Sequence, residues 1–139
     1  MNATTTNHQL RLRHGNFPTL SEALDYAASG ETGCNFYSGR GKLTHVVTYA
    51  ALQKQAQDLA RRLNGLGLPR GARVALIADT TPDFIRFFFA CQYAGLIPVP
   101  LPISLHLGGH QAYVTQLRRL IQNCRVSIAM SPEGFLPFL

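Results

Sequence analysis

The most informative apolar stretch of the chain runs from Val74 to Ala78 without polar alternation. Such a run is typical of a strand that is covered on both faces in a parallel sheet. Thr81 and Pro82 then favour a helix start, and the helix that they open is apolar nearly all round, with only Arg86 and Gln92 clearly polar in its body, until Gly95 ends it. We expect this helix to lie between layers, because each large apolar side chain left exposed costs about 1.5–3 kcal/mol.

The pattern that follows completes a repeating α/β unit. Ile97–Pro102 predicts an extended segment that lies at a sheet edge or runs out into a loop, because its alternating prolines have no N–H donors. Tyr113–Cys124 has the apolar spacing of an amphipathic helix, and Val126–Met130 returns to strand. Residues 73–130 therefore predict a βαβαβ unit, with parallel strands and right-handed crossovers in an open, doubly wound α/β sheet.

Before this unit the pattern predicts a short helix and a hairpin. Thr19 and Glu22 have the spacing of a capping box, and Gly30 is expected to end the helix in the left-handed conformation. Two strand-like runs, Cys34–Ser38 and Leu43–Tyr49, are joined by the glycine-bearing turn 39–42.

A second helix is predicted between the hairpin and the sheet. Thr48 is its expected cap, Asp58 is placed to pair with Arg62 four residues later, and Gly65 and Gly67 end the helix. The apolar stripe of this helix consists of Leu52, Ala56, Leu59, Leu63 and Leu66.

Composition favours a folded chain and argues against some partners. With 139 residues, 46% hydrophobic and 14% charged, the chain has the balance of one domain or a piece of one. The net charge of +6 permits an anionic partner, but the basic residues form no run of four and are not interleaved with aromatic residues, so no specific nucleic-acid partner is expected.

The cysteines and the N-terminal residues indicate the cellular compartment. Cys34, Cys91 and Cys124 each lie in or beside an apolar stretch, and we expect them to be buried thiols of a reducing compartment. No secretory signal or membrane span is recognisable, so we expect a cytoplasmic protein, with residues 1–16 as a flexible leader.

The candidate ligand-binding residues follow from the fold class. Open α/β sheets bind ligands at the carboxyl ends of their strands, which here are Asp79–Thr81 and the Pro102–Gly109 loop. Asp79 or Thr80 would contact a substrate there. In the alternative interpretation Thr81 only caps the helix, and Asp79 only favours its positive end.

Other motifs do not reach a catalytic pattern. Gly39–Lys42 has neither the spacing of a Walker loop nor that of a dinucleotide fingerprint, and it is expected to be a turn. His106 and His110 have helical metal-ligand spacing, but Gly108 and Gly109 interrupt the helix between them. Ser104 lacks a nucleophile turn. We therefore assign no catalytic, cofactor-binding or metal-ligating residue.

The order of segments resembles the N-terminal region of adenylate-forming acyl ligases. The resemblance rests on Thr48–Leu52 leading into a helix, then on Gly71–Leu76, Pro82–Phe84 and Tyr93–Leu101. The proline-rich strand, followed by a glycine-bearing insert, looks more like the fatty acyl-AMP ligase branch than the CoA-ligase branch.

This resemblance implies an ATP- and Mg²⁺-dependent activation of a fatty acid to an acyl-adenylate, with transfer to an acyl carrier protein or to CoA. The phosphate loop and the catalytic lysine of the family lie outside the matched segments. Residues 17–139 would thus be a truncated N-terminal portion, inactive alone, whose partner is the rest of the ligase polypeptide. The apolar tail that ends at Leu139 favours this interpretation. The alternative is a self-contained flavodoxin-like binding or interaction module without catalysis.

Overall fold

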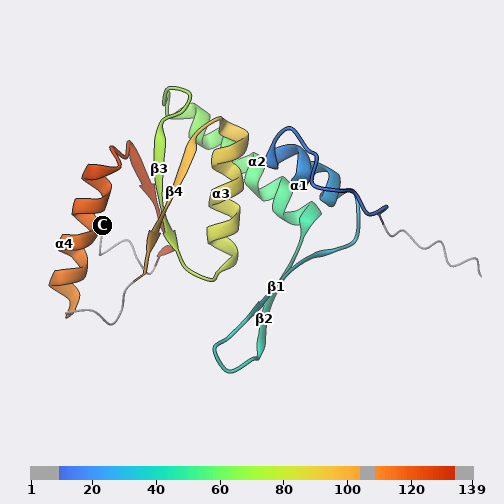
Figure 1. Cartoon of the computed structure of the whole chain (residues 1–139), viewed down its shortest axis with the longest axis horizontal. Coiled ribbons are helices and arrows are strands. Elements are labelled where there is room, and N and C mark those ends of the chain that lie inside the picture. Colours follow the sequence, from blue (N-terminus) through green and yellow to red (C-terminus); the bar gives the residue numbers. More distant parts are fainter. Residues whose placement is uncertain (1–9, 104–108, 134–139) are drawn as a thin grey trace, which may run out of the picture. The chain divides into compact units, whose positions relative to one another are not determined.

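The computed structural model describes residues 10–103 and 109–133, and it divides the chain into two compact units, Met1–Lys54 and Gln55–Leu139 (Figure 1). The elements, in chain order, are α1 (Leu20–Ala28), β1 (Gly33–Tyr37), β2 (Leu43–Thr48), α2 (Tyr49–Gly65), β3 (Arg73–Ala78), α3 (Pro82–Ala94), β4 (Ile97–Pro102), α4 (Gly109–Asn123) and β5 (Ile128–Met130). The predicted mixed α/β fold with a hairpin and a βαβαβ unit is confirmed.

Helix α1 starts as predicted but ends differently. The Thr19 Oγ1 atom accepts from the Glu22 N–H at 3.2 Å, and the same hydroxyl donates to the Glu22 carboxylate at 3.1 Å. Gly30 was expected to be left-handed, and this is wrong: the cap is Ser29, in the right-handed region. A Cβ built on Gly30 would lie 2.7 Å from Cδ1 of Leu10, a flexible side chain that can move aside.

Residues that precede α1 contact it. The Arg13 guanidinium lies 4.2 Å from the ring centre of Phe17 and 5.5 Å from that of Tyr26. The Tyr26 hydroxyl donates to the Arg11 carbonyl. Cation–π contacts and a hydrogen bond therefore hold the segment 10–17 along this helix.

Strands β1 and β2 form the predicted antiparallel hairpin, with Gly33 opposite Thr48 and Tyr37 opposite Leu43. Gly41, at φ 75°, makes the turn, and the Ser38 N–H donates to the Lys42 carbonyl at 2.8 Å. Residues 39–42 are thus a hairpin turn, as expected.

Helix α2 is capped where the pattern predicts, since the Ala51 N–H donates to the Thr48 hydroxyl at 3.2 Å. Leu52, Ala56 and Leu63 of the apolar stripe are buried, and Leu59 is half-buried. The placement of Leu66 in the stripe is wrong. Leu66 is 60% exposed, because the helix ends at Gly65 and the chain turns away there.

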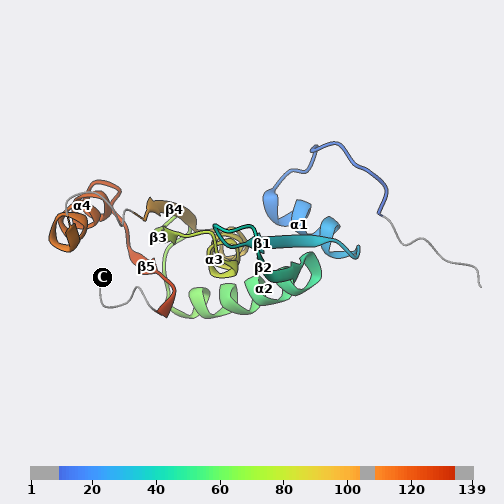
Figure 2. The ribbon, with the colours of Figure 1, turned by 90° about the horizontal axis from the view of Figure 1, so that it is seen from below.

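The second unit contains a parallel sheet with strand order β4-β3-β5. In Figures 1 and 2 the sheet lies between α3 and α4. Val74 and Leu76 pack with Ala90 and Cys91 of α3 on one face. Ala75 and Ile77 pack with Tyr113 and Leu117 of α4 on the other. Helices on both faces make the unit doubly wound, as predicted.

The proline-rich strand β4 is an edge strand, as expected. The Ile97 N–H donates to the Ala72 carbonyl at 2.9 Å, so the backbone N–H groups of the odd-numbered residues of β4 point toward β3. Pro98, Pro100 and Pro102 therefore turn their nitrogens outward, and the outer edge has no N–H donors over these three positions.

Helix α3 is less buried than its composition suggests. Ala90 and Cys91 are buried, whereas Phe84, Phe87 and Phe88 are half-buried and pack against the core from its margin. The expectation of a helix buried between layers is thus wrong for its phenylalanines, because one side of α3 faces the sheet and only part of the remainder is covered.

Helices α3 and α4 end in the same Schellman arrangement. After α3, Gly95 is left-handed at φ 70° and the Leu96 N–H donates to the Cys91 carbonyl. After α4, Arg125 takes φ 50° and the Val126 N–H donates to the Ile121 carbonyl. Val126, which was predicted to start the strand, belongs to this second cap, so β5 begins at Ile128.

Substitutions at the two caps are expected to change the free energy of unfolding in opposite directions. Gly95→Val is expected to lower the free energy of unfolding by about 1–2 kcal/mol, because a side chain with a Cβ is strained at this φ. Arg125→Gly removes such strain and is expected to raise it by about 0.5–1 kcal/mol. Urea unfolding of both variants measures this, and effects of the same sign would contradict the assigned caps.

Candidate functional site

Local hydrogen bonds to Asp79 fix the backbone just after the carboxyl end of β3. The Thr80 N–H donates to the Asp79 carboxylate at 2.7 Å, and the Thr81 N–H donates to the Asp79 carbonyl at 2.9 Å. Asp79 therefore closes a local turn rather than capping α3. Thr81 occupies the N-cap position, but its hydroxyl makes no capping bond, so the expected side-chain cap is wrong.

Two buried hydroxyls at this end of the sheet have no hydrogen-bond partner in the described part of the chain, Thr81 Oγ1 and Ser131 Oγ. Thr81 follows β3, and Ser131 directly follows β5, which pairs with β3. In strand order β4-β3-β5 the crossover from β3 leads to one side of β3 and the crossover from β4 leads to the other, so the strand order switches between β3 and β5, and ligands bind open sheets at such switch points. Ser131 was not among the candidates, because only the strand pairing brings it to this edge.

The remaining candidates from the sequence follow β4 in the chain. Ser104 and His106 lie outside the described residues. His110 lies in the first turn of α4. Within residues 10–103 and 109–133 no group of three His, Cys, Asp or Glu side chains is arranged to hold a metal ion.

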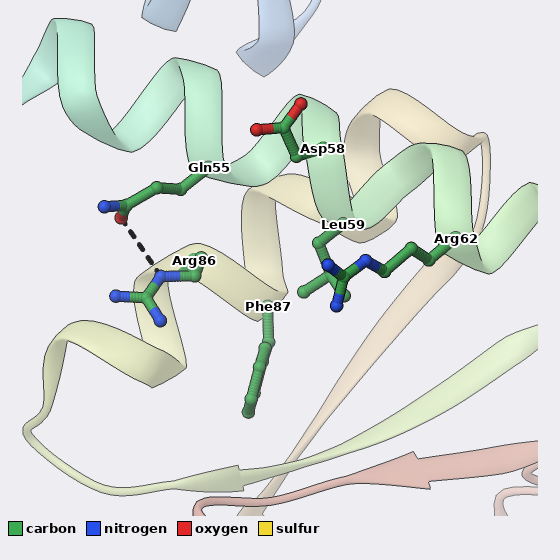
Figure 3. A pocket seen from close by; sticks show the side chains of 6 residues that line it. All are labelled: Gln55, Asp58, Leu59, Arg62, Arg86 and Phe87. Atoms are coloured by element: carbon green, nitrogen blue, oxygen red, sulfur yellow. Dashed lines mark hydrogen bonds between the residues drawn. The ribbon is translucent and has the colours of Figure 1, made fainter.

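A separate hollow lies between α2 and α3 and has a volume of 360 Å³ (Figure 3). Its lining residues are Gln55, Asp58, Leu59, Arg62, Arg86 and Phe87. Arg86 bridges the two helices, since its Nε donates to the Gln55 Oε1 at 3.1 Å, and it also pairs with Asp83 at 2.9 Å.

The charge pairs of α2 differ from the expected ones. Asp58 pairs with Arg61, three residues later, and not with Arg62. Arg62 is thereby left as a lining residue of the hollow. The sequence signal was Arg86, which together with Asp83 is charged in an otherwise apolar helix. The partner helix that completes the hollow follows only from tertiary packing.

The cysteines fall into two classes. All three are free thiols, Cys91 is buried, and Cys34 and Cys124 are only half-buried, so the expectation of three buried thiols is wrong for two of them. Burial raises the pKa of Cys91 from 9.0 to about 12. The pKa of Tyr49 is also raised, chiefly by the charge on ionised Cys34 and then by burial.

We expect the folded chain to protect Cys91 from alkylation. Its raised pKa lowers the thiolate fraction near neutral pH about a thousandfold, and the thiolate is the reactive form. Because the unfolded chain ionises first, the free energy of unfolding should also fall as pH rises from about 9 towards 12. Mass spectrometry after iodoacetamide treatment measures the labelling, with urea-unfolded chain as the control. Equal labelling rates for Cys91 and Cys124 in the folded chain would contradict it.

None of the helices in residues 10–103 and 109–133 combines the length and apolar character that a bilayer span requires.

Known proteins match this chain along most of its length. The AMP-binding enzyme family model matches residues 31–133. A putative acyl-CoA synthetase of Caulobacter vibrioides is 47% identical over 131 residues, which cover 94% of this chain and 23% of that protein. A crotonobetaine/carnitine–CoA ligase of Salmonella paratyphi A is 33% identical over 90 residues, 65% of this chain and 16% of that one. The chain thus spans under a quarter of these relatives.

Solved structures of similar fold support the same family assignment as the sequence comparisons. One from a study of fatty acyl-adenylate ligases of E. coli and L. pneumophila has a TM-score of 0.84 and 42% identity, over 91% of this chain and 23% of that chain. An adenylation domain of a keto acid-selecting NRPS module, 21% identical with a TM-score of 0.72, shares the fold. The resemblance seen in the sequence is confirmed, and the chain belongs to the AMP-binding enzyme family of adenylate-forming acyl ligases.

Proposed function

We propose that this chain is the N-terminal structural portion of an ATP-dependent ligase that activates a fatty acid as its acyl-adenylate and passes the acyl group to a carrier protein or to CoA. The observation that carries the proposal is the 47% identity with a putative acyl-CoA synthetase over 131 residues. The similarity to a structure from work on fatty acyl-adenylate ligases supports a fatty acid as the substrate. The proposal places the enzyme in the cytoplasm.

The chain's part in this activity is structural. Adenylation brings a carboxylate to the α-phosphate and needs cations and phosphate donors to offset the developing charge. The glycine pair at 39–41 forms a hairpin turn rather than a phosphate loop, and in the described ranges no three His, Cys, Asp or Glu side chains are grouped to hold a metal ion. Under this proposal, residues 17–139 position elements that the remaining ligase polypeptide supplies.

Fatty-acid-dependent ATP–pyrophosphate exchange tests the proposal in two arms. The 139-residue chain alone is expected to give no exchange above background. A chimera in which this chain replaces the corresponding 131-residue segment of the Caulobacter relative is expected to retain exchange, whereas that relative without the segment should not. Robust exchange by the chain alone, or an inactive but well-folded chimera, would overturn the proposal.

A further inference from the structure

The three-stranded sheet has one edge that can still accept a strand. This edge is β5, on the side of β3 opposite β4 (Figure 2), and within residues 10–103 and 109–133 no further strand pairs with it. The Ser127 N–H donates to the Arg73 carbonyl at 2.8 Å, so the N–H and C=O groups of Ile128 and Met130 point away from β3. The outer edge of β4 offers no such donors, because its outward positions are prolines.

The side chains along the β5 edge are incompletely covered. Ile128 and Met130 pack against the core that contains Val74 and Leu76, yet both stay half-buried. Ala129, whose side chain lies on the opposite face of the strand, is exposed. A strand added here would therefore bury apolar side chains on one face of the sheet and would meet only a methyl group on the other.

The sequence of β5 is complementary to itself about Ala129. If two copies pair antiparallel with Ala129 opposite Ala129, Ile128 lies opposite Met130 of the partner subunit, and their outward N–H and C=O groups meet as donor and acceptor. The two side chains then form an apolar cross-strand pair. The Ala129 pair is the narrowly spaced one without hydrogen bonds, and a methyl group fits this spacing.

Charged residues extend the complementarity beyond the strand. Arg125 and Glu133 are each four positions from Ala129, so the two-fold axis brings opposite charges together at both ends of the paired strands. Both side chains are exposed, and neither forms an ion pair with a residue in the described ranges.

We propose that the outer edge of β5 is a self-association surface, through which two copies of this chain join their three-stranded sheets around a two-fold axis. A second copy fits the edge because it supplies the matching apolar residues and the opposite charge at both ends. Prolines close the other edge of the sheet, so this association ends at the dimer. The interface does not depend on the proposed ligase function.

Sedimentation equilibrium of the 139-residue chain tests the dimer. Chain concentrations from about 10 µM to 1 mM are needed, because so short a strand buries less area than a standard interface. We expect a reversible monomer–dimer equilibrium. Ala129→Lys places two positive charges opposite each other at the axis and is expected to weaken dimerisation at least about tenfold. Ala112→Lys makes the same change at an exposed position of α4 and should alter dimerisation by less than about twofold.

Exchanging the charges tests the two-fold pairing. Arg125→Glu and Glu133→Arg each leave like charges opposite each other, and each should weaken dimerisation about tenfold at low salt. An equimolar mixture of the two variants should dimerise as tightly as the original chain, because every charge then meets its opposite in the partner. Both positions are exposed, so the variants should fold, and circular dichroism checks this.

Amide hydrogen exchange identifies the edge that is in contact. The Ile128 and Met130 amides should gain protection as the chain concentration rises, whereas the Ser127 amide, already bonded to β3, should change much less. The proposal is overturned by a monomer at every concentration, by species larger than a dimer, by equal effects of Ala129→Lys and Ala112→Lys, or by a mixture that dimerises no better than its components. Protection of the Ile128 and Met130 amides in the monomer would show that a segment of the same chain occupies the edge, which also overturns it.

Discussion

Replacing Leu76 with alanine is expected to lower the free energy of unfolding by about 3–5 kcal/mol. Leu76 is fully buried in the central strand β3, and its side chain belongs to the core cluster that contains Val74, Ala90 and Cys91. Neighbouring strands hold its backbone on both sides, opposite Pro100 and Met130. The cavity therefore has little freedom to collapse, which places the cost near the top of the range for such substitutions.

Leu66→Ala is the matched control, because the same atoms are removed from a side chain that is 60% exposed. Its effect on unfolding in urea should stay within about 0.5 kcal/mol. Leu76→Ile keeps the volume and should cost less than about 1.5 kcal/mol, which keeps the test informative if Leu76→Ala does not fold. Equal effects of Leu76→Ala and Leu66→Ala would contradict the position of β3 at the centre of the core.

The elements that were predicted well are those whose signal is local or periodic. The unalternated run in β3, the prolines of β4 and the turn around Gly41 each leave few alternatives to the chain, and the structure confirms all three. The doubly wound arrangement followed from these elements because right-handed crossovers admit few topologies.

The predictions that were wrong depended on choices between near-equal local interactions. Asp58 has arginines both three and four residues later, and an exposed pair at either spacing differs by only tenths of a kcal/mol. Arg125 is an unusual residue for a left-handed cap, so the end of α4 carried no glycine signal. Gly30 was expected to end α1 in the left-handed conformation, but the helix is capped by Ser29 in the right-handed region, a choice that no local residue signal distinguishes.

The candidate sites were the least predictable part. The hollow needs Arg62 and Arg86 from two helices, and the switch point of the sheet needs Thr81 and Ser131 from two strands. Each pair is separated by more than twenty positions, and only packing brings its members to one place. Sequence periodicity reports which face of an element is buried, but it does not report which other element covers that face.

Gly33→Ala is expected to open the start of the β1–β2 hairpin at a cost of about 3 kcal/mol, the upper range for an overpacked site. The added methyl group would lie 2.6 Å from the Cα of Thr48 and would overlap the carbonyl oxygen of Val47. Both atoms belong to the backbone of the opposite strand, so no side-chain rotation relieves the clash. Tyr37 and Val46 are largely exposed, so little burial compensates for the lost pairing.

Native-state hydrogen exchange of the hairpin amides measures this cost, because the hairpin can open without global unfolding. Gly39→Ala is the matched control in the turn of the same hairpin, where a new methyl group meets nothing within 4 Å. That variant should change the protection by no more than about 0.5 kcal/mol. The Tyr49 amide, which donates to the Thr32 carbonyl at 3.0 Å, should lose protection in Gly33→Ala only. Equal protection in the two variants would show that Gly33 and Thr48 are not paired as the structure places them.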